Sequence, residues 1–151
     1  MAIREKTTVT LKADANCPTH SKSDVSIRDL VFHIDEPVER GGTNTGPTPT
    51  DTAIAALIGC TNVIGHKCAA KLGVDIGQLK ITASCAFDRR GVTLAEEIDV
   101  PFVRVALIVE CGGSATVGEI ETVATEVEKF CPLSKLFEKA GTDLAVTWRK
   151  A

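Results

Sequence analysis

Hydrophobic and polar residues alternate along six short segments of the chain, which is the pattern of half-buried β-strands. These strands are expected at residues 7–12, 25–27, 30–34, 79–87, 100–111 and 144–148. The first segment places Val9 and Leu11 on one face, and a tight turn at Arg28 and Asp29 separates the second segment from the third. In the fifth segment, aliphatic residues at alternate positions form one face, and Arg104 lies on the other.

A long helix is expected to follow the glycine- and proline-rich loop at residues 37–49. Thr48 is placed to be its N-cap, with Pro49 at the first helical position, where proline is favoured. Asp51 lies three positions after the cap, so it closes a variant of the capping box and favours the positive end of the helix dipole. This capping role accounts for Asp51 without a catalytic one, and the helix is expected to reach about residue 71 before Gly73 ends it.

The first half of this helix, TAIAALIGC, is apolar or small on all sides, and it ends on Cys60. A helix with this pattern is expected to be buried on every side. Because one sheet covers only one side, a second subunit is the expected source of the remaining cover. Gly59 costs about 1 kcal/mol of helix propensity relative to alanine, and it allows another element to approach the helix backbone beside Cys60.

A second long helix is predicted after the Gly112-Gly113 pair, where Thr116 and Glu119 form a capping box. Apolar residues then recur at helical spacing as far as Cys131. Pro132 ends this helix and begins a short one that Cys131 can cap. Strands and helices do not strictly alternate in this order, which indicates an α+β fold with a mostly antiparallel sheet.

Composition and charge limit the classes of protein to consider. The chain has 151 residues and a net charge of −3, so we expect one domain over residues 1–151 and no affinity for nucleic acid or an anionic membrane. The N-terminus is charged at Arg4, Glu5 and Lys6 and lacks the apolar core of a signal peptide. The longest charge-free apolar stretch, residues 52–65, is shorter than a membrane span, so a cytoplasmic protein is expected.

Six cysteines are the candidate chemical groups, and without a CxxC motif they predict neither a zinc knuckle nor a thioredoxin-type site. They are Cys17, Cys60, Cys68, Cys85, Cys111 and Cys131. The simplest role for each is that of a small buried hydrophobe. Cys60 and Cys131 lie on the two long helices, and a thiol peroxidase needs such a pair. One thiolate attacks the O–O bond, and the second cysteine converts the resulting sulfenic acid into a disulfide.

The remaining candidates have simpler structural roles. Cys17 and His20 provide only two metal ligands, which is half a site. His66 is about 120° around the helix from Cys60, so it is not expected to be its base. Cys68 is about 12 Å along the same helix, which is too far for a disulfide with Cys60.

Two motifs show a family resemblance: GGTNTGPTPTDTAIAALIGCTNV at residues 41–63 and FCPLSKLF at residues 130–137. In this order they resemble the OsmC/Ohr family of osmotically inducible and organic hydroperoxide resistance proteins. The resemblance implies an intertwined homodimer with two long buried helices and active sites at the subunit interface. It also implies Cys60 as the peroxidatic thiol, Cys131 as the resolving thiol, a dithiol reductant, often a lipoyl group, and no metal, haem or flavin.

One departure from the family pattern keeps two hypotheses open. The family's organic hydroperoxide reductases have a glutamate ten positions before the first cysteine and an arginine from the N-terminal region. Here position 50 is threonine, CPTHSKSD contains no arginine, and the nearest candidates are Arg28 and Arg40. The two cysteines favour a hydroperoxide reductase. The missing glutamate and the unassigned arginine favour a protein that binds a small molecule in an apolar interface pocket, with vestigial or redox-sensing thiols.

Overall fold

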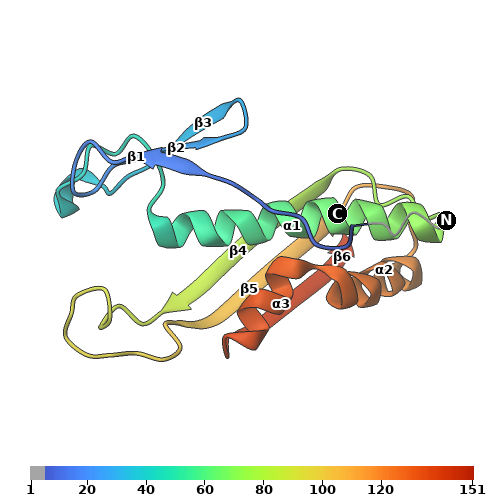
Figure 1. Ribbon diagram of the computed structural model, residues 1–151. Coiled ribbons are helices and arrows are strands. Elements are labelled where there is room, and N and C mark those ends of the chain that lie inside the picture. The colour runs from blue at the N-terminus through green and yellow to red at the C-terminus, as the bar shows by residue number, and fades with distance from the viewer. Residues whose placement is uncertain (1–5) are drawn as a thin grey trace. The chain divides into compact units, whose positions relative to one another are not determined.

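The computed structural model describes residues 6–151, in which six strands, three α-helices and one 3-10 helix are formed (Figure 1). The chain divides into two compact units, Met1–Thr52 and Ala53–Ala151. The α+β class is confirmed, and the expectation of a single domain over residues 1–151 stays a prediction.

The first unit contains a three-stranded antiparallel sheet in the order β1-β2-β3, and a 3-10 helix follows it. The elements are β1 (Asp14–Asn16), β2 (Ser23–Ile27), β3 (Leu30–Ile34) and η1 (Val38–Arg40). The predicted turn between β2 and β3 is present, with Arg28 at a φ of 56°. The strand predicted at residues 7–12 is not formed. Asp14 pairs with Ser26, one residue before the end of β2. Because the two strands are antiparallel, residues before Ala13 lie beyond the end of β2, beside the turn, where β2 offers no residue for pairing.

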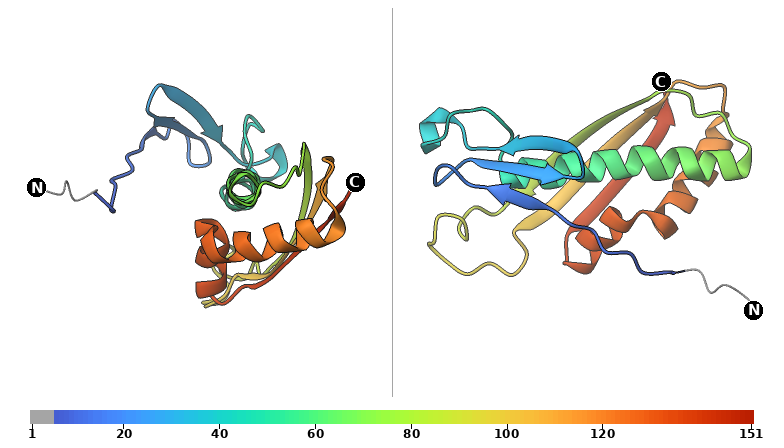
Figure 2. Two further views of the ribbon diagram at one scale, coloured as in Figure 1. Left: turned by 90° about the vertical axis from the view of Figure 1, so that its right-hand side faces the viewer. Right: turned by 45° about the horizontal axis from the view of Figure 1, so that its top comes forward.

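The second unit contains the other sheet, in the order β4-β5-β6, and helices cover one of its faces (Figure 2). The elements are β4 (Leu79–Phe87), β5 (Phe102–Cys111), α2 (Val117–Phe130), α3 (Pro132–Lys139) and β6 (Asp143–Lys150). β4 and β5 are antiparallel, whereas β5 and β6 are parallel, with Val105 opposite Leu144. A parallel pair needs a crossover connection, and α2 and α3 provide it.

Helix α1 (Pro49–Leu72) begins in the first unit and continues into the second. Its predicted capping box is confirmed, because the Asp51 amide donates to Thr48 Oγ1 at 3.1 Å and the Thr48 amide donates to Asp51 Oδ2 at 3.4 Å. Gly73, with a φ of 68°, follows its last turn. By length and composition alone α1 meets the criteria for a membrane span, with a mean hydropathy of 1.3, but the core helices of soluble proteins also meet them.

The single chain buries one side of α1, and the expected cover of the other side by a second subunit stays a prediction. The buried residues of α1 form one stripe: Leu57, Thr61, Gly65, Cys68 and Ala69. The opposite stripe contains Ala55, Ala56, Gly59 and Val63, and Val63 is 51% exposed. A three-stranded sheet and two short helices are enough to cover one side of a 24-residue helix only.

The close approach to a helical glycine occurs six residues later than predicted. A Cβ at Gly59 would meet nothing within 4 Å, whereas a Cβ at Gly65 would lie 2.7 Å from the Trp148 ring. Gly65 therefore allows β6 to pack closely on α1. Around it lies the larger hydrophobic core, to which α1, β5 and α2 contribute buried residues such as Ala69, Val109 and Val123.

Candidate thiol site

Cys60 and Cys131, which are 71 positions apart, lie side by side in the second unit. The Cys131 thiol donates a hydrogen bond to Cys60 Sγ, and the two sulfurs are 3.4 Å apart. Both are free cysteines. Cys131 is fully buried, and Cys60 is half-buried. The sulfurs are close enough to form a disulfide after a small movement, and Cys60 is the more accessible of the two.

The break between α2 and α3 positions Cys131. The capping box predicted for α2 is present, because the Glu119 amide donates to Thr116 Oγ1 and the Glu119 carboxylate accepts from the Thr116 amide. At the other end, the Cys131 amide donates to the Val127 carbonyl at 2.9 Å. The Cys131 sulfur in turn accepts from the Ser134 amide at 3.5 Å, so it caps α3 as predicted. One residue thus ends α2, begins α3 and fixes the direction of its thiol.

Burial raises the pKa of the Cys60 thiol above its ordinary value, since the low-polarity surroundings disfavour the thiolate. The Leu133 backbone amide acts in the opposite direction, and the neighbouring Cys131 thiol adds to the increase in pKa. Within residues 6–151, no hydrogen bond or ion pair joins a lysine, arginine or histidine to either sulfur. Strong nucleophilicity at neutral pH therefore requires a further positive group near Cys60.

Three other cysteines have the environment of packing residues. Cys68 and Cys111 are buried in the core, and Cys85 is half-buried on β4. In each case burial raises the pKa of the thiol. The packing role predicted for Cys68 agrees with this burial.

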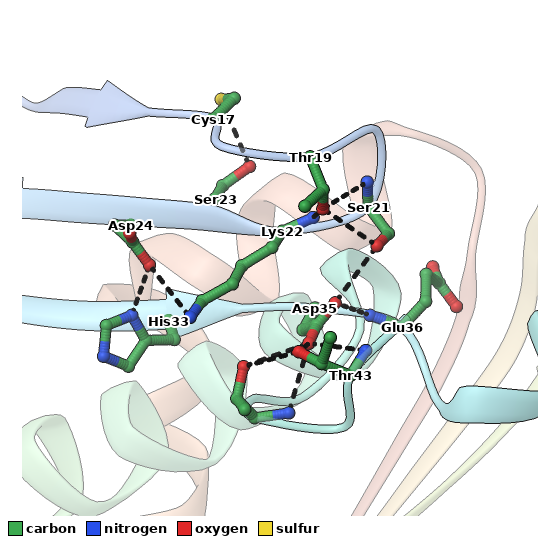
Figure 3. A network of polar contacts seen from close by, with 11 residues as sticks. Cys17, Thr19, Ser21, Lys22, Ser23, Asp24, His33, Asp35, Glu36 and Thr43 are labelled. Carbon is green, nitrogen blue, oxygen red and sulfur yellow. Dashed lines mark hydrogen bonds and ion pairs between the residues drawn. The ribbon is translucent and has the colours of Figure 1, made fainter. Parts of the chain in front are cut away.

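Cys17 differs from the other cysteines because it is exposed, with its sulfur 3.4 Å from the Ser23 hydroxyl (Figure 3). In the described part of the chain, no group of three or more histidine, cysteine, aspartate or glutamate side chains is arranged to hold a metal ion. Cys17 and His20 therefore remain a partial ligand set.

Asp35 is a structural centre of the first unit that the sequence did not indicate (Figure 3). Its fully buried carboxylate accepts hydrogen bonds from the amide and hydroxyl of both Thr43 and Thr45. It also accepts from the Ser21 hydroxyl and the Glu36 amide. These bonds, led by the one from the Thr43 hydroxyl, lower the pKa of the Asp35 carboxyl well below its ordinary range. The carboxylate therefore holds the loop that precedes α1 in one conformation.

A second candidate site is an apolar cavity of about 240 Å³ in the second unit. It lies between the start of α1, the segment that leads into β5, and α3, and its liners include Ala53, Val100, Leu136 and Phe137. Leu136 is exposed at this place, whereas Phe137 belongs to the core. A cavity with this lining is suited to an apolar ligand rather than to a charged one.

Comparison with known proteins agrees with this fold. Residues 42–147 match the family model of the OsmC-like proteins. An OsmC-like protein from Mycoplasma pneumoniae has a TM-score of 0.79 and 16% identity, with 95% of this chain and 98% of that chain covered.

Two similar structures carry hydroperoxide-resistance names. The organic hydroperoxide resistance protein OsmC of Legionella pneumophila has a TM-score of 0.69 at 18% identity and covers 95% and 98% of the two chains. The organic hydroperoxide resistance protein OhrB of Bacillus subtilis has a TM-score of 0.64 at 19% identity, with 93% and 98% covered. No curated protein matches the chain. The family match spans most of the sequence, and the chain belongs to the OsmC-like protein family.

Proposed function

We propose that this protein is a thiol-dependent peroxidase that reduces organic hydroperoxides, with Cys60 as the peroxidatic and Cys131 as the resolving cysteine. The observation that supports this most directly is the distance of 3.4 Å between the two sulfurs. The names of the Legionella and Bacillus proteins of the same fold support the substrate class.

The chemistry proceeds in three balanced steps. The Cys60 thiolate attacks one peroxide oxygen, and the O–O bond breaks. The departing alkoxide is protonated to an alcohol, and Cys60 becomes a sulfenic acid. Cys131 then attacks the Cys60 sulfur, the S–O bond breaks, and a disulfide and water are formed. An external dithiol reduces this disulfide by thiol–disulfide exchange and is itself oxidised. We assign this role to a dithiol of the lipoyl type, and the reaction needs no metal, haem or flavin.

The active form in this proposal is a homodimer in the cytoplasm. The uncovered stripe of α1 supports the dimer, because an apolar helix face in contact with water is unfavourable. A second chain also offers a source for the positive group that Cys60 lacks within the described residues.

Single-turnover oxidation tests this proposal. Reduced wild-type protein, Cys60→Ser and Cys131→Ser are mixed with cumene hydroperoxide or hydrogen peroxide, and the thiols are followed by mass spectrometry. We expect cumene hydroperoxide to oxidise the wild type faster than hydrogen peroxide does. The wild type should form a Cys60–Cys131 disulfide, which a dithiol then reduces for further turnover, and Cys131→Ser should retain a trapped sulfenic acid. Cys60→Ser should be inactive, and Cys68→Ser is the matched control that keeps activity. Two reduced thiols under excess peroxide would contradict the proposal.

The apolar cavity supports a second candidate function, that of a protein that binds small apolar molecules. In that case the thiols are redox-sensing or vestigial. Binding of an alkyl ligand would then be weakened by Leu136→Asp and unaffected by Cys60→Ser, which isothermal titration calorimetry can measure. The two functions are distinguished because the peroxidase requires Cys60 and the binding protein does not.

A further inference from the structure

The two sulfurs of the thiol pair differ in how far an outside molecule can reach them. Cys131 is 0% exposed and belongs to the larger hydrophobic core, whereas Cys60 is half-buried on α1. A thiolate that opens a disulfide attacks one sulfur and displaces the other, so its access to the attacked sulfur limits the rate. If the two sulfurs were joined, this access would exist at Cys60 and would be blocked at Cys131.

The first turn of α3 places a backbone amide at each sulfur. Cys131 is the N-cap residue of α3, and its sulfur accepts from the Ser134 amide at 3.5 Å. The Leu133 amide faces the Cys60 sulfur. The hydrogen bonds within α3 begin with the Lys135 amide, which donates to the Cys131 carbonyl at 3.1 Å, so the Ser134 amide is left to the sulfur. A thiolate at Cys131 would therefore lie at the positive end of the helix dipole.

We propose that the reductant attacks a Cys60–Cys131 disulfide at Cys60, and that Cys131 is the leaving thiolate, stabilised by the Ser134 amide. The inference rests on the proposed peroxidase function and adds to it the atom at which the dithiol reacts. Both sulfurs meet an amide of α3, so the difference in accessibility decides which of them is attacked.

The reduction then balances in two exchanges. One thiolate of the dithiol forms a bond to the Cys60 sulfur, the bond between the two protein sulfurs breaks, and the electron pair stays on Cys131. The second thiol of the reductant attacks its own sulfur in this mixed disulfide and releases Cys60 as a thiolate. The dithiol becomes a cyclic disulfide, and its two protons pass to the two cysteines. Peroxide and dithiol thus react in turn at the same sulfur, and the buried Cys131 contacts neither.

The position of a trapped mixed disulfide tests this assignment. The Cys60–Cys131 disulfide is made with diamide, which needs no peroxide, and is treated briefly with the monothiol 2-mercaptoethanol. Acid stops the exchange, and digestion with pepsin at low pH followed by mass spectrometry locates the adduct. We expect more than about tenfold more adduct on Cys60 than on Cys131, because attack at the buried sulfur is blocked. An early adduct mainly on Cys131 would overturn the proposal.

Ser134→Pro tests the positioning role of the amide, because proline has no amide hydrogen and is tolerated in the first turn of a helix. We expect the Cys60 adduct to form about tenfold more slowly, the effect of one lost hydrogen bond. A loosened α3 would have the opposite effect, since it would expose the disulfide, speed the reaction and place adduct on both cysteines. Gly118→Pro, in the first turn of α2 with open space around it, is the matched control and should keep the wild-type rate. An unchanged or faster reaction of Ser134→Pro would overturn the role of this amide.

The outcomes separate this inference from the proposed function. If diamide forms the disulfide but hydroperoxides leave Cys60 reduced, the peroxidase function fails, and the position of the adduct still decides which sulfur a thiol attacks. If diamide forms no disulfide between Cys60 and Cys131, both the function and the inference fail.

Discussion

At the residue scale, the buried carboxylate of Asp35 is the most specific polar feature of the first unit. Each of its hydrogen bonds favours the ionised form, so the folded state holds this group at a pKa well below that of the unfolded chain. A lowered folded pKa contributes stability that is complete above the unfolded value of about 3.9 and is lost as the pH falls below it.

We therefore expect the loop of residues 36–48 to become sensitive to proteases as the pH is lowered below about 4. Asp35→Asn should produce this sensitivity at neutral pH, because its amide group would face the donors of Thr43 and Thr45. Limited proteolysis at several pH values, analysed by mass spectrometry, measures both effects. Asp29→Asn, in the exposed turn between β2 and β3, is the control. Equal cleavage of Asp35→Asn and wild type at pH 7 would refute the role of this carboxylate.

A second prediction at this scale concerns the order in which the thiols react. Cys17 is exposed, whereas Cys68 and Cys111 are buried with raised pKa values, so alkylation of the native protein should begin at Cys17. Brief treatment with iodoacetamide at pH 7.5, followed by mass spectrometry, gives the order. Modification of Cys68 at the rate of Cys17 would show that the core around α1 is open.

The individual residues also show what a sequence can and cannot indicate. The pairing of Cys60 with Cys131 followed from a family resemblance, because a separation of 71 positions gives no distance. The role of Asp35 was missed because its partners are backbone amides and hydroxyls up to fourteen positions away, which only the folded chain brings together.

At the scale of elements, capping residues and strand patterns were the most informative parts of the sequence. Both capping boxes and the range of β4 are as predicted, because they depend on neighbouring residues. The strand predicted at residues 7–12 was wrong because its formation depends on a partner strand elsewhere in the chain. The sequence of α1 predicts an apolar helix that needs cover, but it does not indicate which element covers each side, because the covering residues lie elsewhere in the chain or in a second subunit.

The packing of β6 on α1 gives a prediction at this scale. Gly65→Ala would place a methyl group 2.7 Å from the Trp148 ring, and overpacking of this kind costs about 1–3 kcal/mol of unfolding free energy. Gly118→Ala, on the open side of α2, has no such neighbour and should stabilise the protein by up to about 1 kcal/mol. Urea denaturation of both variants measures the difference. Equal free energies of unfolding for Gly65→Ala and the wild type would show that β6 moves away from the added methyl group without loss of stability.

At the scale of the whole molecule, the uncovered stripe of α1 predicts self-association. Ala56→Arg would place a charge in this stripe and should convert a dimer into a monomer, as measured by light scattering after size exclusion. Thr125→Arg, on the exposed side of α2, should leave the mass unchanged. A wild-type protein that is monomeric at micromolar concentration would contradict the proposed homodimer and require another cover for the helix.

The position of Cys131 at the junction of α2 and α3 has a consequence for the unfolded chain. A covalent bond to Cys60 would close a loop of about 70 residues, which removes chain entropy equivalent to about 4 kcal/mol from the unfolded state. The oxidised protein should therefore melt several degrees above the reduced protein, and Cys131→Ser should abolish the difference in a calorimetric scan. Each oxidation would then join the crossover connection of α2 and α3 covalently to α1. The free energy of unfolding would therefore be greatest directly after the protein has reacted with an oxidant.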